Sequence, residues 1–127
     1  MATVAIFNSS EDTVEALRLA FEHHGFETVS EHIDHIKRGS VDFVEFVKTH
    51  DPQAVVYDIA PPYDQNFTFL KLIRNTEVMR GRPVVLTTTH KANLEKLVGP
   101  TDALEIIGKP YDLEQVVAAA TRALGAR

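Results

Sequence analysis

At 127 residues, with 44% hydrophobic and 24% charged residues, the chain has the size and composition of one globular domain, which we expect to span residues 1–127. The absence of cysteine excludes disulfides, thiolate metal sites and thiol nucleophiles. The net charge of −5, with basic residues scattered along the chain, disfavours nucleic-acid binding. No apolar run approaches the roughly 20 residues of a membrane span, so we expect a cytoplasmic protein with no membrane partner.

Short apolar runs alternate with amphipathic stretches along the whole chain. The runs are nearly continuous, which is typical of strands buried on both faces, whereas the stretches repeat their apolar residues at intervals of three and four, which is typical of helices. In chain order the pattern predicts a strand at 3–7, a helix at 11–24, a strand at 26–33, a helix at 40–50, a strand at 54–59, a helix at 66–79, a strand at 84–88, a helix at 92–98, a strand at 104–107 and a helix at 113–124. The strand at 26–33 has the weakest signal.

Strands separated by helical stretches predict βαβ units, because parallel neighbours need a crossover long enough to hold a helix. We therefore expect an α/β fold, a three-layer αβα sandwich around a doubly wound, five-stranded parallel sheet. In such a sheet the ligand crevice lies beyond the carboxyl ends of the strands. The polar residues expected at those ends are Asn8, Ser9, Asp58, the threonines at 87–89 and Lys109.

Three of these polar groups have chemistry suited to a phosphoryl group. Asp58 offers a carboxylate nucleophile, Lys109 a positive charge for phosphate oxygens, and a threonine hydroxyl a hydrogen bond to the same group. The alternative is structural. Asp58 then forms an ion pair with Lys109 that holds one conformation, and the threonine satisfies backbone groups at its strand end.

The motifs around these residues resemble the receiver domains of two-component response regulators over essentially the whole chain. Asp58, followed by Pro62, is similar to the family's phosphoacceptor and its loop proline. Lys109, followed by Pro110, is similar to the family's lysine–proline turn. The resemblance implies a cis bond between Lys109 and Pro110, which costs little for proline.

The same resemblance assigns a hydroxyl, a fold and a function. Counting from Asp58 into the strand at 84–88 places the family's serine or threonine at Thr88, with Thr87 one position off. The resemblance implies a flavodoxin-like sheet with strand order 2-1-3-4-5, in which Asp58, Thr88 and Lys109 form the phosphoryl site. It further implies a signalling module, not an enzyme, whose partner is a histidine kinase or a phosphotransfer protein.

The metal site departs from the family's pattern. The resemblance implies Mg²⁺ held by Asp58, the backbone of Ala60 and an acidic pair after the first strand, but Asn8 and Ser9 stand where that pair belongs. The affinity of a hard cation depends on the charge of its oxygen ligands. We therefore expect a weak or empty Mg²⁺ site and no other cofactor. Ile106 also stands where the family commonly has an aromatic residue that changes rotamer on activation.

These features leave two functions open. The first is an atypical stand-alone receiver in a phosphorelay, which accepts a phosphoryl group on Asp58 weakly or conditionally. The alternative is a phosphorylation-independent pseudo-receiver, an interaction or dimerisation module that could form a homodimer. A flavodoxin-like ligand binder is disfavoured because the chain lacks a glycine-rich phosphate loop. His32 and His35 have a spacing seen in metal sites, but the lack of cysteine and of a partner motif favours solvated surface histidines.

Overall fold

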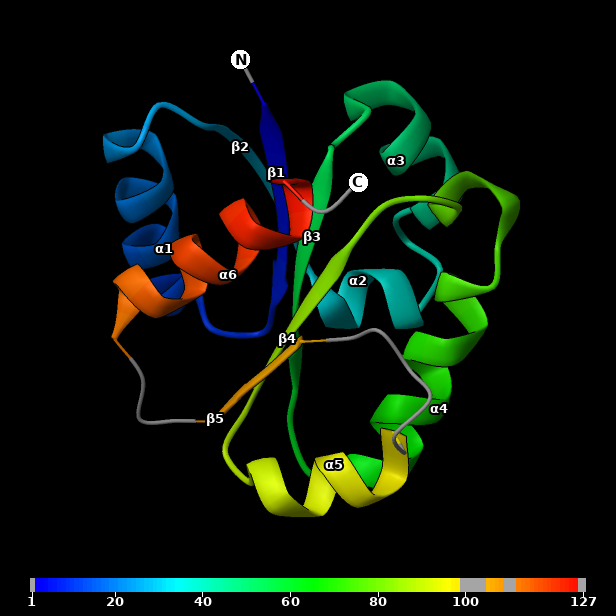
Figure 1. Cartoon of the computed structure of the whole chain (residues 1–127). Coiled ribbons are helices and arrows are strands. Elements are labelled where there is room, and N and C mark those ends of the chain that lie inside the picture. The colour runs from blue at the N-terminus through cyan, green and yellow to red at the C-terminus, as the bar shows by residue number, and fades with distance from the viewer. Residues whose placement is uncertain (1, 99–104, 109–111, 126–127) are drawn as a thin grey trace.

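Parallel pairing of five strands forms the sheet at the centre of the molecule (Figure 1). The computed structural model describes residues 2–98, 105–108 and 112–125. The strands lie in the order β2-β1-β3-β4-β5, and every neighbouring pair is parallel. Their bounds are Thr3–Asn8 (β1), Glu27–His32 (β2), Ala54–Ile59 (β3), Val84–Thr88 (β4) and Glu105–Gly108 (β5).

Helices cover both faces of this sheet (Figure 1). One face packs against α1 (Glu11–His23) and α6 (Leu113–Gly125). The helices on the other face are α2 (Ile33–Lys37), α3 (Phe43–His50), α4 (Tyr63–Arg74) and α5 (Lys91–Val98), with a short 3-10 helix, η1 (Glu77–Met79), after α4. None of the helices in the described part of the chain combines the length and apolar character that crossing a bilayer requires.

Each face of the sheet has its own apolar core, because successive side chains of a strand point to opposite faces. Ile6 of β1 packs with Leu17 of α1 in the core beneath α1 and α6. Phe7, the next residue, points the other way and lies with its ring centroid 5.5 Å from Phe43 of α3 and 6.0 Å from Tyr57 of β3. Strands buried on both sides explain why their sequences are continuous apolar runs.

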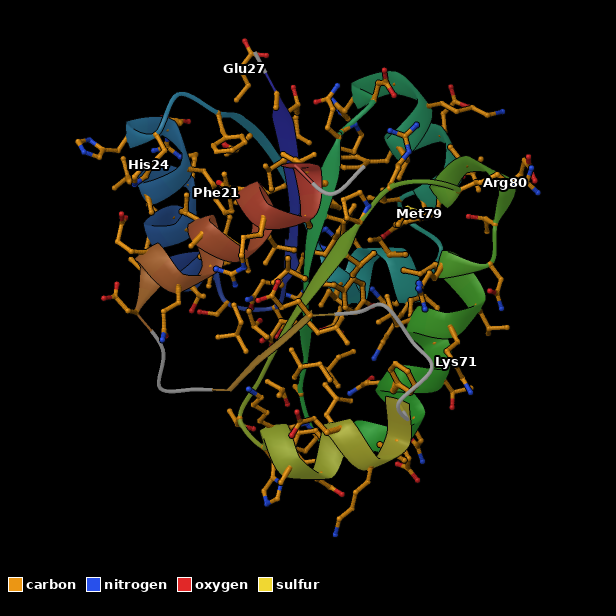
Figure 2. The ribbon with its side chains drawn as sticks, viewed as in Figure 1. Phe21, His24, Glu27, Lys71, Met79 and Arg80 are labelled. Atoms are coloured by element: carbon orange, nitrogen blue, oxygen red, sulfur yellow. The ribbon has the colours of Figure 1, made fainter. Side chains whose placement is uncertain are left out.

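Local signals at both ends of α1 explain its bounds. The Ser10 hydroxyl accepts a hydrogen bond from the backbone N–H of Thr13 at 3.3 Å, which caps the start of the helix. Gly25 follows the helix at a φ of +87°, a conformation that glycine adopts readily. The backbone N–H of Phe26 then donates to the carbonyl of Phe21, and the centroids of the two rings lie 5.4 Å apart. Figure 2 shows Phe21 toward the end of α1.

The structure confirms the expected fold class and strand order, with two differences in the helices. The helix predicted at 66–79 is two elements, because α4 begins at Tyr63 and ends at Arg74, and η1 follows separately. The sequence pattern missed α2 altogether. This helix has only five residues, and its buried positions, Ile33 and Ile36, are too few to show a helical period.

The substitution Leu17→Ala should lower the free energy of unfolding by about 2–5 kcal/mol, because Leu17 is fully buried between α1 and the sheet. Leu19 lies on the same helix but is 55% exposed, so Leu19→Ala is a matched control that should change stability by less than about 1 kcal/mol. Urea denaturation followed by circular dichroism measures both values. Similar losses for the two variants would contradict the assignment of the inward face of α1.

Candidate functional site

The carboxyl ends of three neighbouring strands bring Asn8, Asp58 and Thr87 to one edge of the sheet. Phe7 pairs with Tyr57 between β1 and β3, and Asp58 pairs with Thr87 between β3 and β4. Phe7 and Tyr57 belong to the core beneath α2, α3 and α4, so the residues that follow them point toward the opposite face. Asn8, Asp58 and Thr87 therefore share the face covered by α1 and α6.

Asp58 is a buried acid with a buried hydroxyl beside it. Only 6% of Asp58 and none of Thr87 is exposed. The Thr87 hydroxyl donates a hydrogen bond to the Asp58 Oδ1 atom at 2.7 Å. A carboxylate in such a place needs donors, because an unmatched buried charge is costly. The contact therefore stabilises and orients this carboxylate.

The hydroxyl that meets Asp58 thus comes from Thr87, although counting along the sequence pointed to Thr88. Thr88 pairs with Ile59 and so lies on the opposite face of β4 from Thr87. Its hydroxyl oxygen accepts a hydrogen bond from the backbone N–H of His90 at 3.3 Å, within the loop after β4. A phosphate-sensing role for Thr88 stays a prediction. Lys109 lies outside the described residues, as does its expected cis bond to proline.

The oxygens expected to hold Mg²⁺ are a poor set for a divalent cation. The Asn8 side-chain oxygen accepts a hydrogen bond from the backbone N–H of Ser10 at 2.9 Å, and Ser9 is exposed. The Ala60 carbonyl accepts one from the Asn66 side-chain amide at 2.7 Å. Asp58 supplies the one carboxylate among the four expected ligands, whereas a hard cation favours several charged oxygens. These residues do not fit a tight Mg²⁺ site.

A cavity of about 330 Å³ opens beside Asp58 at the same edge of the sheet. Its polar wall includes residues that the sequence pattern did not single out as site residues, two of them on the helix α2 that was not predicted. These are Asp34 and Lys37 of α2 and Gln65 and Asn66 of α4. Asp34 and Lys37 therefore share the lining of this cavity with Asp58.

Tyr57 also lines this cavity from the strand that carries Asp58. Its side chain is 1% exposed, and its hydroxyl has no hydrogen-bond partner among the described residues. Burial, and to a lesser extent the neighbouring charge of Asp58, raises the pKa of Tyr57 well above its usual range. The phenol is therefore neutral at physiological pH and cannot serve as a base there.

The loops after β3 and β4 are joined beside the site. Tyr63, the first residue of α4, shares a hydrogen bond with Thr89, with the two oxygens 2.6 Å apart. The ring of Tyr63 also lies 6.0 Å from that of His90. This contact couples the start of α4 to the loop that follows Thr87 and Thr88.

A second cavity, of about 370 Å³, lies between the ends of β1 and β2 and has His32 and His35 in its wall. His35 Nδ1 lies 2.8 Å from Glu31 Oε1, and the ring nitrogen of His32 accepts a hydrogen bond from the backbone N–H of Asp34. The side chains of His32 and His35 are 29% and 44% exposed, so both are surface histidines as the sequence predicts, and each also contacts a neighbouring residue. Within the described residues, no group of three or more histidine, aspartate or glutamate side chains could hold a metal ion.

Glu31 is a half-buried acid of this second cavity whose pKa the fold lowers. Burial alone raises the pKa of Glu31, but the hydrogen bond with His35 and the backbone N–H of His32 outweigh it and leave the pKa lowered. The folded state is therefore more stable when Glu31 is ionised than when it is protonated.

Comparison with known proteins shows the fold and leaves the sequence without a match. No protein-family model and no curated protein matches the chain. Solved structures match it over nearly its whole length, including the chemotaxis protein CheY4 of Vibrio cholerae, with 20% identity, a TM-score of 0.71, and coverage of 97% of this chain and 98% of that one.

Two further solved structures have the same fold. A sensor protein from Polaromonas sp. JS666 matches with 19% identity and a TM-score of 0.77, over 98% of this chain and 97% of that one. A response regulator receiver protein from Sinorhizobium medicae WSM419 matches with 22% identity and a TM-score of 0.71, over 98% and 95% of the two chains. The chain thus has the fold of response-regulator receiver domains.

The substitution Thr87→Val should lower the free energy of unfolding at neutral pH by about 1–3 kcal/mol, because it removes a hydrogen bond to a buried carboxylate. Thr88→Val is the matched control. The Thr88 hydroxyl accepts a hydrogen bond from the backbone N–H of His90. Because His90 is exposed, water can replace this partner, so the loss of stability should be smaller. Urea denaturation of the two variants tests this, and a larger loss for Thr88→Val would contradict the assignment.

The bond between Glu31 and His35 should make stability depend on pH. Because the pKa of Glu31 is lower in the folded state, its carboxylate stabilises the fold above the usual value of 4.5, and this stabilisation is lost as the pH falls through the folded value. The variant His35→Ala should therefore be less stable than the wild type at neutral pH and approach it well below pH 4.5. Urea denaturation across this range measures the difference, which should not be constant.

Proposed function

We propose that this chain is an atypical receiver domain of two-component signalling that acts in the cytoplasm and accepts a phosphoryl group on Asp58 slowly or conditionally. The observation that carries this proposal is the buried Asp58 carboxylate, oriented by the Thr87 hydroxyl at the carboxyl edge of a parallel sheet. Ligands of doubly wound sheets bind at such an edge. Proteins of the same fold include a chemotaxis protein and a response regulator receiver protein.

The chemistry needs a nucleophile and a phosphorylated donor. A carboxylate oxygen of Asp58 forms a bond to phosphorus while the bond between phosphorus and the donor's nitrogen breaks, and that nitrogen leaves with the electron pair. A histidine kinase or a phosphotransfer protein, each phosphorylated on histidine, is the donor that we propose. The chain itself is a signalling module whose output is binding to another protein.

The proposed reaction is slow because the charge on the phosphoryl group lacks a strong counter-ion from metal. Asn8 and Ser9 replace two carboxylates, and the Asn8 oxygen already bonds Ser10. We propose that Mg²⁺ binds weakly at most, and that Lys109 and Thr88 sense the phosphoryl group as the resemblance implies. Weak metal affinity would leave transfer dependent on the protein's own cations.

The second candidate function is a phosphorylation-independent interaction module, including a homodimer. The observation that favours it is that the expected metal ligands Asn8 and Ala60 are uncharged and that their oxygens already accept hydrogen bonds from other residues of the chain. In this case Asp58 serves the fold through its bond with Thr87 and accepts nothing.

Incubation with phosphoramidate, a small phosphoryl donor, separates the two candidates. We expect wild-type protein to gain the mass of one phosphoryl group, and the adduct to be removed by hydroxylamine, as acyl phosphates are. Asp58→Asn removes the nucleophile but keeps the size of the side chain, so it should gain none. An equal adduct on Asp58→Asn, or none on the wild type, would overturn the proposed acceptor role.

A further inference from the structure

The cavity beside Asp58 receives its positive charge from α2. Lys37, in the last turn of this short helix, is the one cation among the described residues that line the cavity. Two acidic residues, Asp58 and Asp34, also line this cavity. Its volume of about 330 Å³ greatly exceeds the roughly 30 Å³ that a water molecule occupies in the liquid, so a phosphoryl group fits inside.

A chain of contacts holds the Lys37 ammonium at the wall of this cavity. Its Nζ atom donates a hydrogen bond to the side-chain oxygen of Asn66, and the Asn66 amide donates to the carbonyl of Ala60 at 2.7 Å. The ammonium also lies 5.8 Å from the centroid of the Phe69 ring. These contacts tie α2 to α4 and to the loop directly after Asp58.

The ammonium keeps donors for a second partner. Lysine has three N–H donors, and the contact with Asn66 uses one of them. A phosphoryl group on Asp58 would bring about 1.5 to 2 negative charges and three acceptor oxygens to a cavity whose lining already includes two aspartates. Such a group needs positive charge beyond that of Lys109, and the expected metal ligands Asn8 and Ser9 carry no charge to recruit a divalent ion.

We propose that Lys37 binds the oxygens of a phosphoryl group on Asp58 and takes the part of a divalent ion, so that phosphorylation of this chain does not depend on Mg²⁺. The inference rests on the proposed acceptor role of Asp58. Lys37 forms no covalent bond and transfers no proton in the step. Its ammonium stabilises the phosphoryl oxygens electrostatically, as lysine does in many phosphate sites.

The test is the rate of phosphoryl transfer from phosphoramidate, measured by intact mass, with excess Mg²⁺ and with excess chelator. Wild-type protein should gain the group at nearly the same rate in both conditions. Lys37→Gln, which removes the charge, should lower the rate in chelator roughly tenfold or more, since a hydrogen bond from a charged donor is being lost. Lys37→Arg should restore most of the rate, because it keeps the charge.

Lys48→Gln is the matched control, because Lys48 is also an exposed lysine in the last turn of a helix, α3, on the same face of the sheet. It should label like the wild type. Urea denaturation of Lys37→Gln shows whether the variant is folded.

The outcomes separate this inference from the function on which it rests. Labelling of the wild type that stops in chelator, or equal rates for the wild type and Lys37→Gln, would overturn the role of Lys37 and leave Asp58 as the acceptor. Labelling that survives Asp58→Asn, or no labelling of the wild type in either condition, would overturn the acceptor role and the inference together.

Discussion

The parallel pairing of β3 with β4 sets Asp58 opposite Thr87, and the chemistry at this edge of the sheet depends on that register. The pairing brings a hydroxyl within 2.7 Å of a buried carboxylate. Side chains of a strand alternate between faces, so a shift of one residue would place Leu86 or Thr88 opposite Asp58 in place of Thr87. The apolar cores on both faces of the sheet hold the register, because each core accepts only alternate residues of every strand.

Two features set the charge at this edge of the sheet. The side chains after β1 are neutral, and α2 carries a cation, Lys37. The Asn8 side-chain oxygen accepts a hydrogen bond from the backbone N–H of Ser10, which shapes the turn into α1. Asn8 is neutral and so offers a metal no charged ligand. Lys37 of α2 lines the cavity beside Asp58, and its ammonium donates a hydrogen bond to the side-chain oxygen of Asn66. In the proposed mechanism the balancing positive charge therefore belongs to the polypeptide, and an ion in solution is not required.

Most of the fold could be predicted from the sequence, because its signals are local. Nearly continuous apolar runs marked four of the five strands, the strand at 26–33 had a weaker signal, and a serine before the first helix and Gly25 after it marked that helix's ends. The sequence pattern did not predict the short helix α2, because five residues with two buried positions show too little helical periodicity. The sequence pattern also did not predict that the helix at 66–79 would be divided into α4 and η1. Its apolar residues continue past Arg74, although the backbone turns.

The sequence by itself determined the fold class, the acid at the end of the third strand and the uncharged Asn8 and Ser9 after the first, because each depends on residue types and their spacing. The tertiary structure alone decided that Thr87 meets Asp58 and that Lys37 and Asn66 stand in the same cavity. These contacts join residues that are far apart in sequence. They follow from strand register and from the way α2 and α4 pack on the sheet, which the cores determine cooperatively and no local pattern encodes.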